Sequence, residues 1–210
     1  MPVYNGNVKQ KELYFGGVKI KEAYYGSTKV YSAGYPAGTV IFEKSTAGTY
    51  TVTLKHDQKY EIWMVGGGSG GCHRLQATTA QNWWYDNYSG GSGGYIHGIK
   101  KITAGTYTLV VGKGGAGGNA GNNAGGNTTG FGETAGGATS SGWKYVGKGG
   151  SNTTSLSQSV KGNDGIGSST GYSDPTNAGG ASVYGGYGAG GNSHDSPGGA
   201  GYIKIVAVQS

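Results

Sequence analysis

The sequence contains little of several residue types on which folded domains commonly depend. Cys72 is the only cysteine among 210 residues, so disulfide bonds within the chain are excluded. Arg74 is the only arginine and 12% of the residues are charged, so we expect no nucleic-acid partner. Proline occurs four times, too rarely for a collagen-like chain. No apolar run reaches the roughly 18 residues of a membrane span and none opens the chain, so we expect neither membrane insertion nor a secretory signal peptide.

Patterns typical of catalysis and metal binding are also missing. The four histidines are scattered, and none has partners at the spacing of metal ligands, so no metal site is predicted. Glu133 and Asp164 have no obvious mates for acid–base chemistry. Residues 112–117 match a dinucleotide-binding pattern, but the glycine-rich segment after them cannot open a good helix. We therefore expect a protein that is not an enzyme and that binds no cofactor.

Glycine is the residue that the sequence has in excess. All but the first seven of the 48 glycines lie in residues 66–201. One run in which glycine recurs at every third position is Gly112, Gly115, Gly118 and Gly121. Polyproline II has three residues per turn, so the glycines of such a run share one edge, along which neighbouring segments can approach until their backbones meet. We therefore predict a packed bundle of polyproline II segments and not a flexible linker.

Around the glycine runs, alternating apolar and polar residues predict β-strands, and no helical periodicity is present. The sequence therefore predicts an all-β fold with little or no helix, in which a β-sandwich is contiguous with the glycine-rich polyproline II bundle (66–201) within a domain over residues 39–210. The predicted strands are Thr39–Phe42, Gly48–Leu54, Tyr60–Val65, Ala104–Val111 and Gly201–Val208, with Lys55–Gln58 as a hairpin turn between the second and the third.

A repeat of ten residues occupies the N-terminal segment, residues 1–34. Its aromatic positions are Tyr4-Asn5-Gly6, Tyr14-Phe15-Gly16 and Tyr24-Tyr25-Gly26. Each unit is typical of a short strand, with the aromatic–glycine step as its turn. Three such strands bury little surface by themselves, so the segment needs a partner. We predict that it is an attachment or oligomerisation module to which Tyr4, Tyr14, Tyr24 and Tyr25 contribute; the alternative is a simple N-terminal sheet.

Four stretches interrupt the glycine pattern, and loops on a rigid scaffold commonly carry recognition residues. They are residues 72–89, 139–145, 151–177 and 192–196. The candidate receptor-binding residues within them are Trp83, Trp84, Tyr85, Tyr88, Trp143, Tyr145, Tyr172 and His194. Exposed aromatic side chains offer flat apolar contact with a polar edge, which suits sugars and protein loops. The alternative is that these aromatic residues only fill space at the end of the glycine bundle.

The succession of strands that lead into glycine resembles that of phage tail-fibre adhesins with a glycine-rich polyproline II sandwich. The resemblance covers roughly residues 39–210 and is carried by Tyr60–Gly71, Gly90–Gly94 with Ala104–Gly121, and Tyr184–Val206. It implies a rigid glycine-rich core whose distal loops bind a bacterial receptor. A similar layout occurs in the glycine-rich ectodomain of anaplastic lymphoma kinase-type receptors, but those depend on several cysteines and this chain has one.

These features together predict a phage tail or virion surface protein, extracellular after release, that binds a host cell-surface glycan or protein. The N-terminal module would contact other virion proteins or sister copies, with a trimer favoured. The alternative is a purely structural virion component, such as a decoration or tail-tip protein, without receptor binding. The net charge of +6 suits an anionic surface, although solvated strand faces would also explain it.

Overall fold

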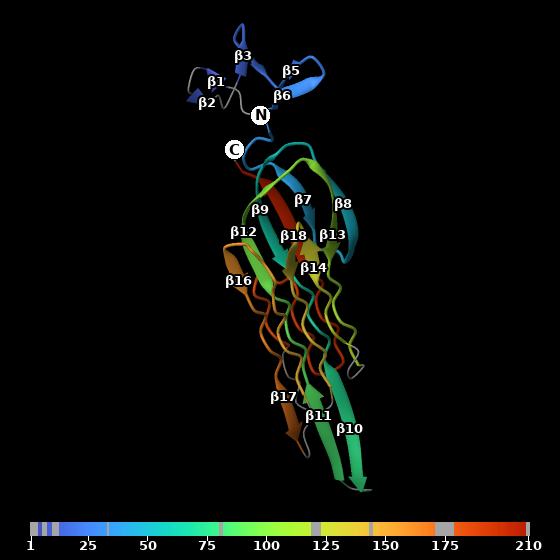
Figure 1. Cartoon of the computed structure of the whole chain (residues 1–210). Coiled ribbons are helices and arrows are strands. Elements are labelled where there is room, and N and C mark those ends of the chain that lie inside the picture. The colour runs from blue at the N-terminus through green and yellow to red at the C-terminus, as the bar shows by residue number, and fades with distance from the viewer. Residues whose placement is uncertain are drawn as a thin grey trace.

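The computed structural model of the chain describes residues 4–5, 8–9, 13–32, 34–79, 82–118, 123–142, 145–170 and 179–208. None of these residues is helical, so they contain no helix that could cross a membrane, and the prediction of an all-β fold is confirmed. Figure 1 shows an elongated molecule with small N-terminal hairpins at one end. A β-sandwich follows, then a bundle of extended segments, and a three-stranded sheet forms the opposite end.

Two antiparallel sheets form the sandwich. The five-stranded sheet has the order β16 (Gln158–Val160), β12 (Tyr95–Ile102), β9 (Gln58–Val65), β18 (Tyr202–Ala207) and β7 (Val40–Lys44). The four-stranded sheet has the order β15 (Glu133–Ala135), β14 (Thr128–Gly130), β13 (Gly105–Val111) and β8 (Gly48–Leu54).

Alternation along the strands builds the core between these sheets. Every second residue of β9 points inward, and Tyr60, Ile62 and Met64 are fully buried. They pack in one cluster with Leu54 of β8 and Leu109 of β13 from the opposite sheet. Burial of each large side chain stabilises the fold by about 1.5–3 kcal/mol. The sandwich therefore has a conventional apolar core, and its strands continue into the glycine-rich part of the chain.

The predicted hairpin between β8 and β9 is wrong. The two strands belong to different sheets, so residues 55–57 cross from one layer to the other. The apolar faces of both strands must meet across the core, which edge-to-edge pairing would not allow. β8 pairs instead with β13, from Gly48 opposite Val111 to Leu54 opposite Gly105. The repeated Gly-Thr-Tyr-Thr sequences that open these two strands thus lie at opposite ends of the ladder and meet only at Thr51 and Thr108.

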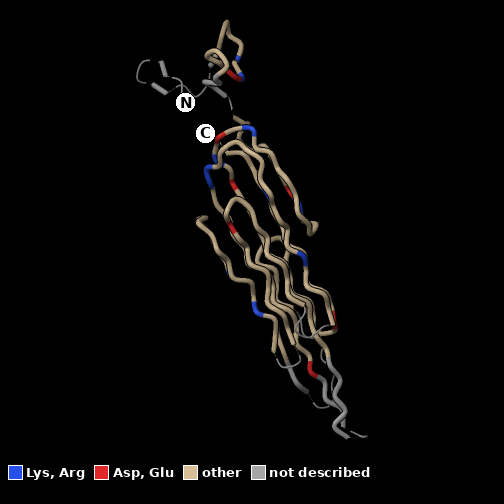
Figure 2. The backbone as a smooth tube through the Cα atoms, turned by 45° about the vertical axis from the view of Figure 1, so that its right-hand side comes forward, with Lys and Arg blue, Asp and Glu red and all other residues tan. Residues whose placement is uncertain are grey.

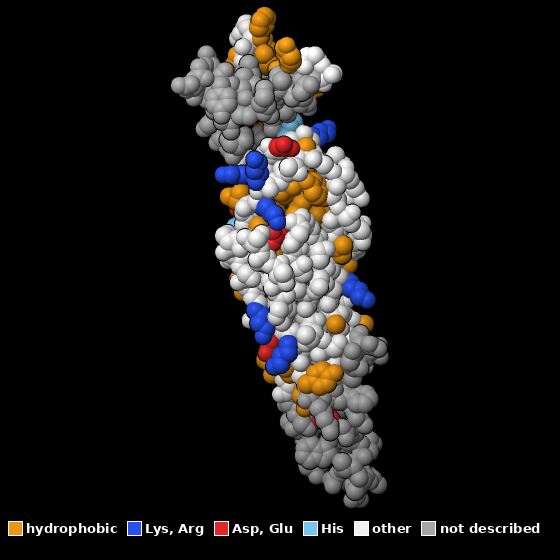
Figure 3. Space-filling view, viewed as in Figure 1, with side chains coloured by type: hydrophobic (Ala, Val, Ile, Leu, Met, Phe, Trp, Pro, Cys, Tyr) orange, Lys and Arg blue, Asp and Glu red, His pale blue; other side chains and the backbone are white. Residues whose placement is uncertain are grey.

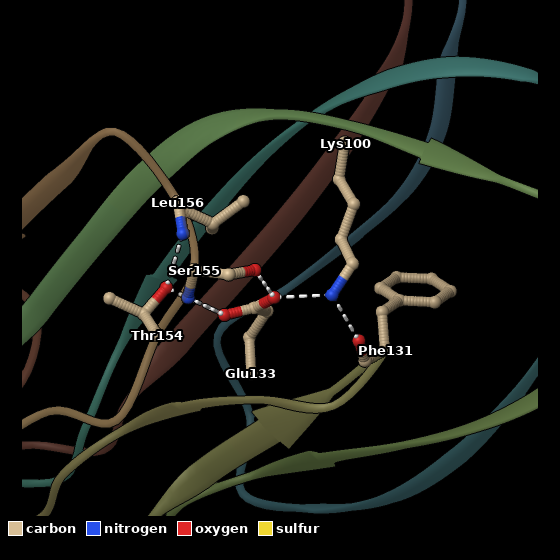
Figure 4. A network of polar contacts seen from close by, with 6 residues as sticks. All are labelled: Lys100, Phe131, Glu133, Thr154, Ser155 and Leu156. Carbon is tan, nitrogen blue, oxygen red and sulfur yellow. Dashed lines mark hydrogen bonds and ion pairs between the residues drawn. The ribbon is translucent and has the colours of Figure 1, made fainter.

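A buried carboxylate links the two sheets. Glu133 on β15 is 2% exposed and forms an ion pair with Lys100 of β12, and Thr154 and Ser155 also donate to it (Figure 4). Burial by itself would raise the pKa of Glu133, but the hydrogen bonds from Lys100, Ser155 and Thr154 outweigh it and lower the pKa to about 2. The sequence offered no partner for Glu133 because its three partners lie 21 to 33 residues away.

The ten-residue repeat forms three separate two-stranded hairpins, not three single strands. They are β1 (Tyr4–Asn5) with β2 (Val8–Lys9), β3 (Leu13–Phe15) with β4 (Val18–Ile20), and β5 (Glu22–Tyr25) with β6 (Thr28–Ser32). The aromatic–glycine steps lie at the turns, where Gly16, Gly17 and Gly26 adopt positive φ angles of 57°, 81° and 59°. Left-handed backbone of this kind is typical of two-residue hairpin turns.

Candidate functional site

Residues 66–71 run from β9 to β10 (Cys72–Thr79) and form the first of two central segments of the bundle. Their six backbone N–H groups donate in rotation to three neighbouring segments. The pairs are Gly66 to Gly94 and Ser69 to Gly91, Gly67 to Gly126 and Gly70 to Asn123, and Gly68 to Gly199 and Gly71 to Ser196, all at 2.8–2.9 Å. A backbone that returns to the same neighbour at every third residue has the repeat of polyproline II. The predicted bundle is therefore present.

Three further segments donate to the carbonyl groups of residues 66–71. The donors are Gly115 to Gly68, Ala138 to Gly67 and Gly191 to Ser69, at 2.8–2.9 Å. Within the described part of the chain, the first central segment is thus hydrogen-bonded to six neighbours. Six neighbours surround a rod completely in hexagonal packing, so this segment lies at the centre of the bundle.

Residues 89–94, which run from β11 (Asn82–Tyr88) to β12, form the second central segment. In the described residues it is bonded to the first central segment and to five others. The pairs are Ser69 to Gly91, Gly94 to Gly136, Gly147 to Ser89, Ser92 to Asn163, Gly180 to Gly90 and Gly90 to Gly191, all at 2.8–3.0 Å. The two central segments therefore lie side by side, each enclosed by the rest of the bundle.

Glycine is required where the central segments touch their neighbours. A Cβ on Gly66, Gly67, Gly68 or Gly70 would stand well under 3.0 Å from a backbone carbonyl oxygen of another segment. The carbonyl groups belong to Gly136, Lys113, Ala189 and Ala116, on three different neighbours. Backbone-to-backbone packing on several sides thus leaves no room for any side chain at these positions.

Buried polar side chains complete the hydrogen bonding where the glycine pattern is broken. Asn123 and Ser141 are fully buried. The Asn123 Nδ2 donates to the Gly70 carbonyl oxygen at 2.9 Å and to the Ser141 Oγ at 2.7 Å, and its Oδ1 accepts from the Ser141 N–H at 2.8 Å. Ser69, also fully buried, accepts from the Gly91 N–H at 2.9 Å. These side chains fill the bundle without leaving their polar groups unsatisfied.

Beyond the bundle, the two central segments continue directly into an antiparallel hairpin. β10 follows residue 71, β11 precedes residue 89, and their register runs from Cys72 opposite Tyr88 to Thr79 opposite Asn82. β17 (Gly167–Thr170) pairs with β11 and completes a three-stranded sheet, which we call the tip sheet. Figure 1 shows the tip sheet at the end of the molecule opposite the N-terminal hairpins. The hairpin is thus held by the two most enclosed segments.

The main aromatic candidates lie on this hairpin. Trp83, Trp84 and Tyr85 are residues of β11 and pair with Ala77, Gln76 and Leu75 of β10. The prediction of a loop over residues 72–89 was wrong. The two central segments of the bundle continue into β10 and β11, which pair as antiparallel strands. The backbone of these three aromatic residues is described, whereas their side chains lie outside the described part of the structure.

The base of the hairpin is buried. Cys72 and Asn87 are fully buried and Asp86 is 7% exposed. Tyr88 is half-buried, and its ring covers Gly167 of β17. Burial raises the pKa of the Tyr88 hydroxyl, and the nearby Asp86 adds to the effect. Tyr88 therefore supports the tip sheet from beneath and differs from the exposed aromatic side chain that the sequence suggested.

The turn at residues 192–196 is tied to the hairpin. Asp195 has a φ of 55°, and its Oδ1 accepts a hydrogen bond of 2.9 Å from the His73 backbone N–H. The exposed His194 places its ring 5.3 Å from the His73 ring. The structure thus brings one predicted site residue, His194, to the hairpin base. It also adds His73 and Asp195, which are 122 residues apart and share no spacing that sequence reasoning could recognise.

The remaining candidates lie at a second turn or outside the described residues. Gly142 and Tyr145 exchange backbone hydrogen bonds of 2.9 and 3.3 Å, and the Tyr145 ring lies against Gly142 with 53% of the residue exposed. Val146, the next residue, lies with Tyr88 against Gly167 of β17, so this turn also flanks the tip sheet. Trp143 and Tyr172 lie outside the described residues.

Charge is spread thinly over the described surface. Figure 2 shows basic and acidic residues scattered along the molecule, with no concentration of one sign. Several form ion pairs, such as Lys148 with Asp164 at 3.0 Å and Lys204 with Glu43 at 3.6 Å. In the described residues no group of three or more histidine, cysteine or acidic side chains could hold a metal ion.

Comparison with known proteins agrees with the observed architecture. A family model described as a glycine-rich domain matches residues 44–209. The matched range begins at the end of β7 and runs past the last strand, so it contains the bundle and the tip sheet and leaves out the N-terminal hairpins. No curated protein matches the chain.

Proposed function

The chain belongs to the glycine-rich domain family, and we propose that its bundle is the rigid support of a phage tail or virion surface protein that binds a host cell-surface receptor through the tip sheet. One observation carries this proposal: the hairpin β10–β11 is continuous with the two central segments, residues 66–71 and 89–94. A hairpin held in this way has little freedom to lose when it binds a ligand. Preorganisation of this kind lowers the entropic cost of association.

The placement of the two ends supports the same function. The tip sheet and the N-terminal hairpins lie at opposite ends of the molecule, so one end can attach to a particle while the other faces outward (Figure 1). The partners would be other tail proteins or sister copies at the N-terminal end, in a trimer, and a glycan or protein of the host surface at the tip. Several copies on one particle would add avidity to a modest affinity per copy. The protein would act without catalysis.

Substitution of the paired tryptophans tests the proposal. Trp83→Ala with Trp84→Ala removes two large aromatic side chains from the tip sheet and leaves the bundle and the sandwich core unchanged. We expect the binding of purified protein to host cells to fall by at least about tenfold, as for the loss of central aromatic residues of an interface. Thermal unfolding should stay at the wild-type temperature.

Ile99→Ala is the matched control for this test. Ile99 is 55% exposed on the outer face of β12, a strand of the sandwich, which the bundle separates from the tip sheet (Figure 1). The control should bind cells like the wild type. Undiminished binding of the double tryptophan variant, measured across a panel of host cells, would sink the assignment of the site.

A second candidate function, a purely structural decoration or tail-tip protein, is favoured by the exposed aromatic residues of the N-terminal hairpins. Tyr25 and Phe15 are 83% and 81% exposed, which is typical of a surface that another chain covers. In this case the purified protein would bind no cell of the panel and would still assemble with particle components through its N-terminal end.

A further inference from the structure

The three N-terminal hairpins share one register. Tyr4, Tyr14 and Tyr24 pair with Lys9, Lys19 and Lys29. The next pairs toward the turn are Asn5 with Val8, Phe15 with Val18 and Tyr25 with Thr28. The sequence repeat of ten residues is therefore a structural repeat, in which each hairpin offers the same positions on the same side of its two strands.

These hairpins expose an unusual amount of apolar surface. Tyr25 is 83% exposed, Phe15 81%, Val18 70%, Tyr14 57% and Tyr24 56%. Figure 3 shows hydrophobic side chains projecting from this end of the molecule. The four aromatic rings alone expose about 500 Å² per copy, taking roughly 150–250 Å² for each complete side chain. A stable interface needs about 800 Å² on each partner, so the exposed surface is of the right order for one.

The short connection between the second and third hairpins prevents the third from covering the second. β4 ends at Ile20 and β5 begins at Glu22, so the single residue Lys21 separates the second hairpin from the third. A reversal of the chain needs at least the two residues of a tight turn, so the third hairpin cannot fold back onto the apolar face of the second. Isolated two-stranded hairpins are marginally stable in water, and their cover must come from another chain.

The period of the repeat identifies that chain. The apolar pair Phe15–Val18 and its counterpart Tyr25–Thr28 recur at a fixed step of ten residues. A surface that covers both pairs at once must carry apolar groups at the same step. Another copy of the same segment has this spacing by construction, and the open edges of two-stranded hairpins allow strands of different copies to pair.

We infer that the hairpins β3–β4 and β5–β6 form the interface through which copies of this chain associate, with Phe15 and Tyr25 as its main apolar contacts. The inference rests on the proposed role of residues 1–34 as an attachment or oligomerisation module, and it names the partner. It concerns the N-terminal end alone. A failure of cell binding through the tip sheet would leave it untouched.

The mass of the purified full-length chain in solution tests the inference. One chain has a mass of 21.2 kDa, and light scattering at micromolar concentration should give the mass of two or more chains. Phe15→Ser combined with Tyr25→Ser should reduce it to one chain. Both residues are more than 80% exposed, so this variant keeps the packing of the monomer and should keep its thermal unfolding temperature.

Two controls decide whether the apolar character of these positions is the cause. Phe15→Leu with Tyr25→Leu retains apolar side chains and should retain the higher mass. Ile99→Ser changes a residue that is 55% exposed on β12 of the sandwich and should also retain it. A wild-type chain with the mass of a monomer, or a higher mass that the double serine variant keeps, would overturn the inference. The first result would point to a different virion protein as the partner.

Discussion

Gly71 and Asn192 lie backbone to backbone at the point where the first central segment becomes β10. A Cβ on Gly71 would stand far closer to the Asn192 carbonyl oxygen than the 3.0 Å that real Cβ atoms keep. The Gly71 N–H also donates to the Ser196 carbonyl oxygen at 2.9 Å. The start of the hairpin is therefore fixed by contacts between backbone atoms, and these contacts are possible only because residue 71 is glycine.

Gly71→Ala should destabilise the protein strongly. The methyl group meets a backbone atom that cannot rotate away, so the segments must move apart, and we expect a loss of at least about 3 kcal/mol in the free energy of unfolding. Chemical unfolding followed by circular dichroism measures this change. Gly105→Ala is the control, because a Cβ there would lie an ordinary 3.5 Å from the Tyr107 ring. The idea is wrong if the two alanine variants lose the same stability.

The buried carboxylate of Glu133 should make the stability depend on pH in the acid range. Its pKa is lowered to about 2, against about 4.3 in an unfolded chain, so the unfolded state binds the proton first. The contribution of Glu133 is present above about pH 4.3 and is lost as the pH falls through about 2. The difference in pKa corresponds to about 3 kcal/mol.

Comparison with Glu133→Gln isolates this contribution. The variant keeps the shape of the side chain but has no group to titrate, so it should be less stable than the wild type at neutral pH. The gap in free energy of unfolding should narrow between about pH 4 and pH 2. A gap that stays constant over this range would show that the Lys100–Glu133 pair does not carry the predicted charge.

Two turns beside the hairpin should contribute to receptor binding. Tyr145 is 53% exposed on a turn that flanks β17, and the exposed His194 lies against His73 at the hairpin base. Tyr145→Ala and His194→Ala should each weaken binding to host cells by about 2- to 5-fold, because residues around the centre of an interface contribute less than its central anchors. Binding curves with purified protein measure the change, with Ile99→Ala as control. Unchanged binding in both variants would confine the site to the hairpin itself.

The sandwich could be predicted where side chains alternate cleanly. Residues 48–54 were predicted as a strand and form β8, and β9, β13 and β18 extend over nearly the predicted residues. The glycine spacing also predicted the bundle, because a three-residue repeat has one simple structural meaning. In strands with alternating apolar residues, and in the glycine runs, the local sequence is thus enough to predict the structure.

Other elements depend on contacts that a local pattern cannot show. β12 was not predicted, because Ile99 points outward with 55% exposure while Lys100 points inward to Glu133, and this blurs the alternation. Neither β10 nor β11 has a regular apolar face in its sequence. The two strands pair because the central segments from which they continue lie side by side. The contact between His73 and Asp195 is likewise set by the order of segments in the bundle.

The six-fold surroundings of the central segments have a consequence for how this protein can change. The bundle is held by main-chain hydrogen bonds and by buried polar side chains of its own, so its stability does not depend on which side chains the strands beyond it carry. Residues 74–79 and 82–85 could therefore be exchanged wholesale, giving variants with new specificities on one unchanged scaffold. On a virion, this separation of the bundle from the exchangeable tip residues would let receptor specificity change while the fold stays the same.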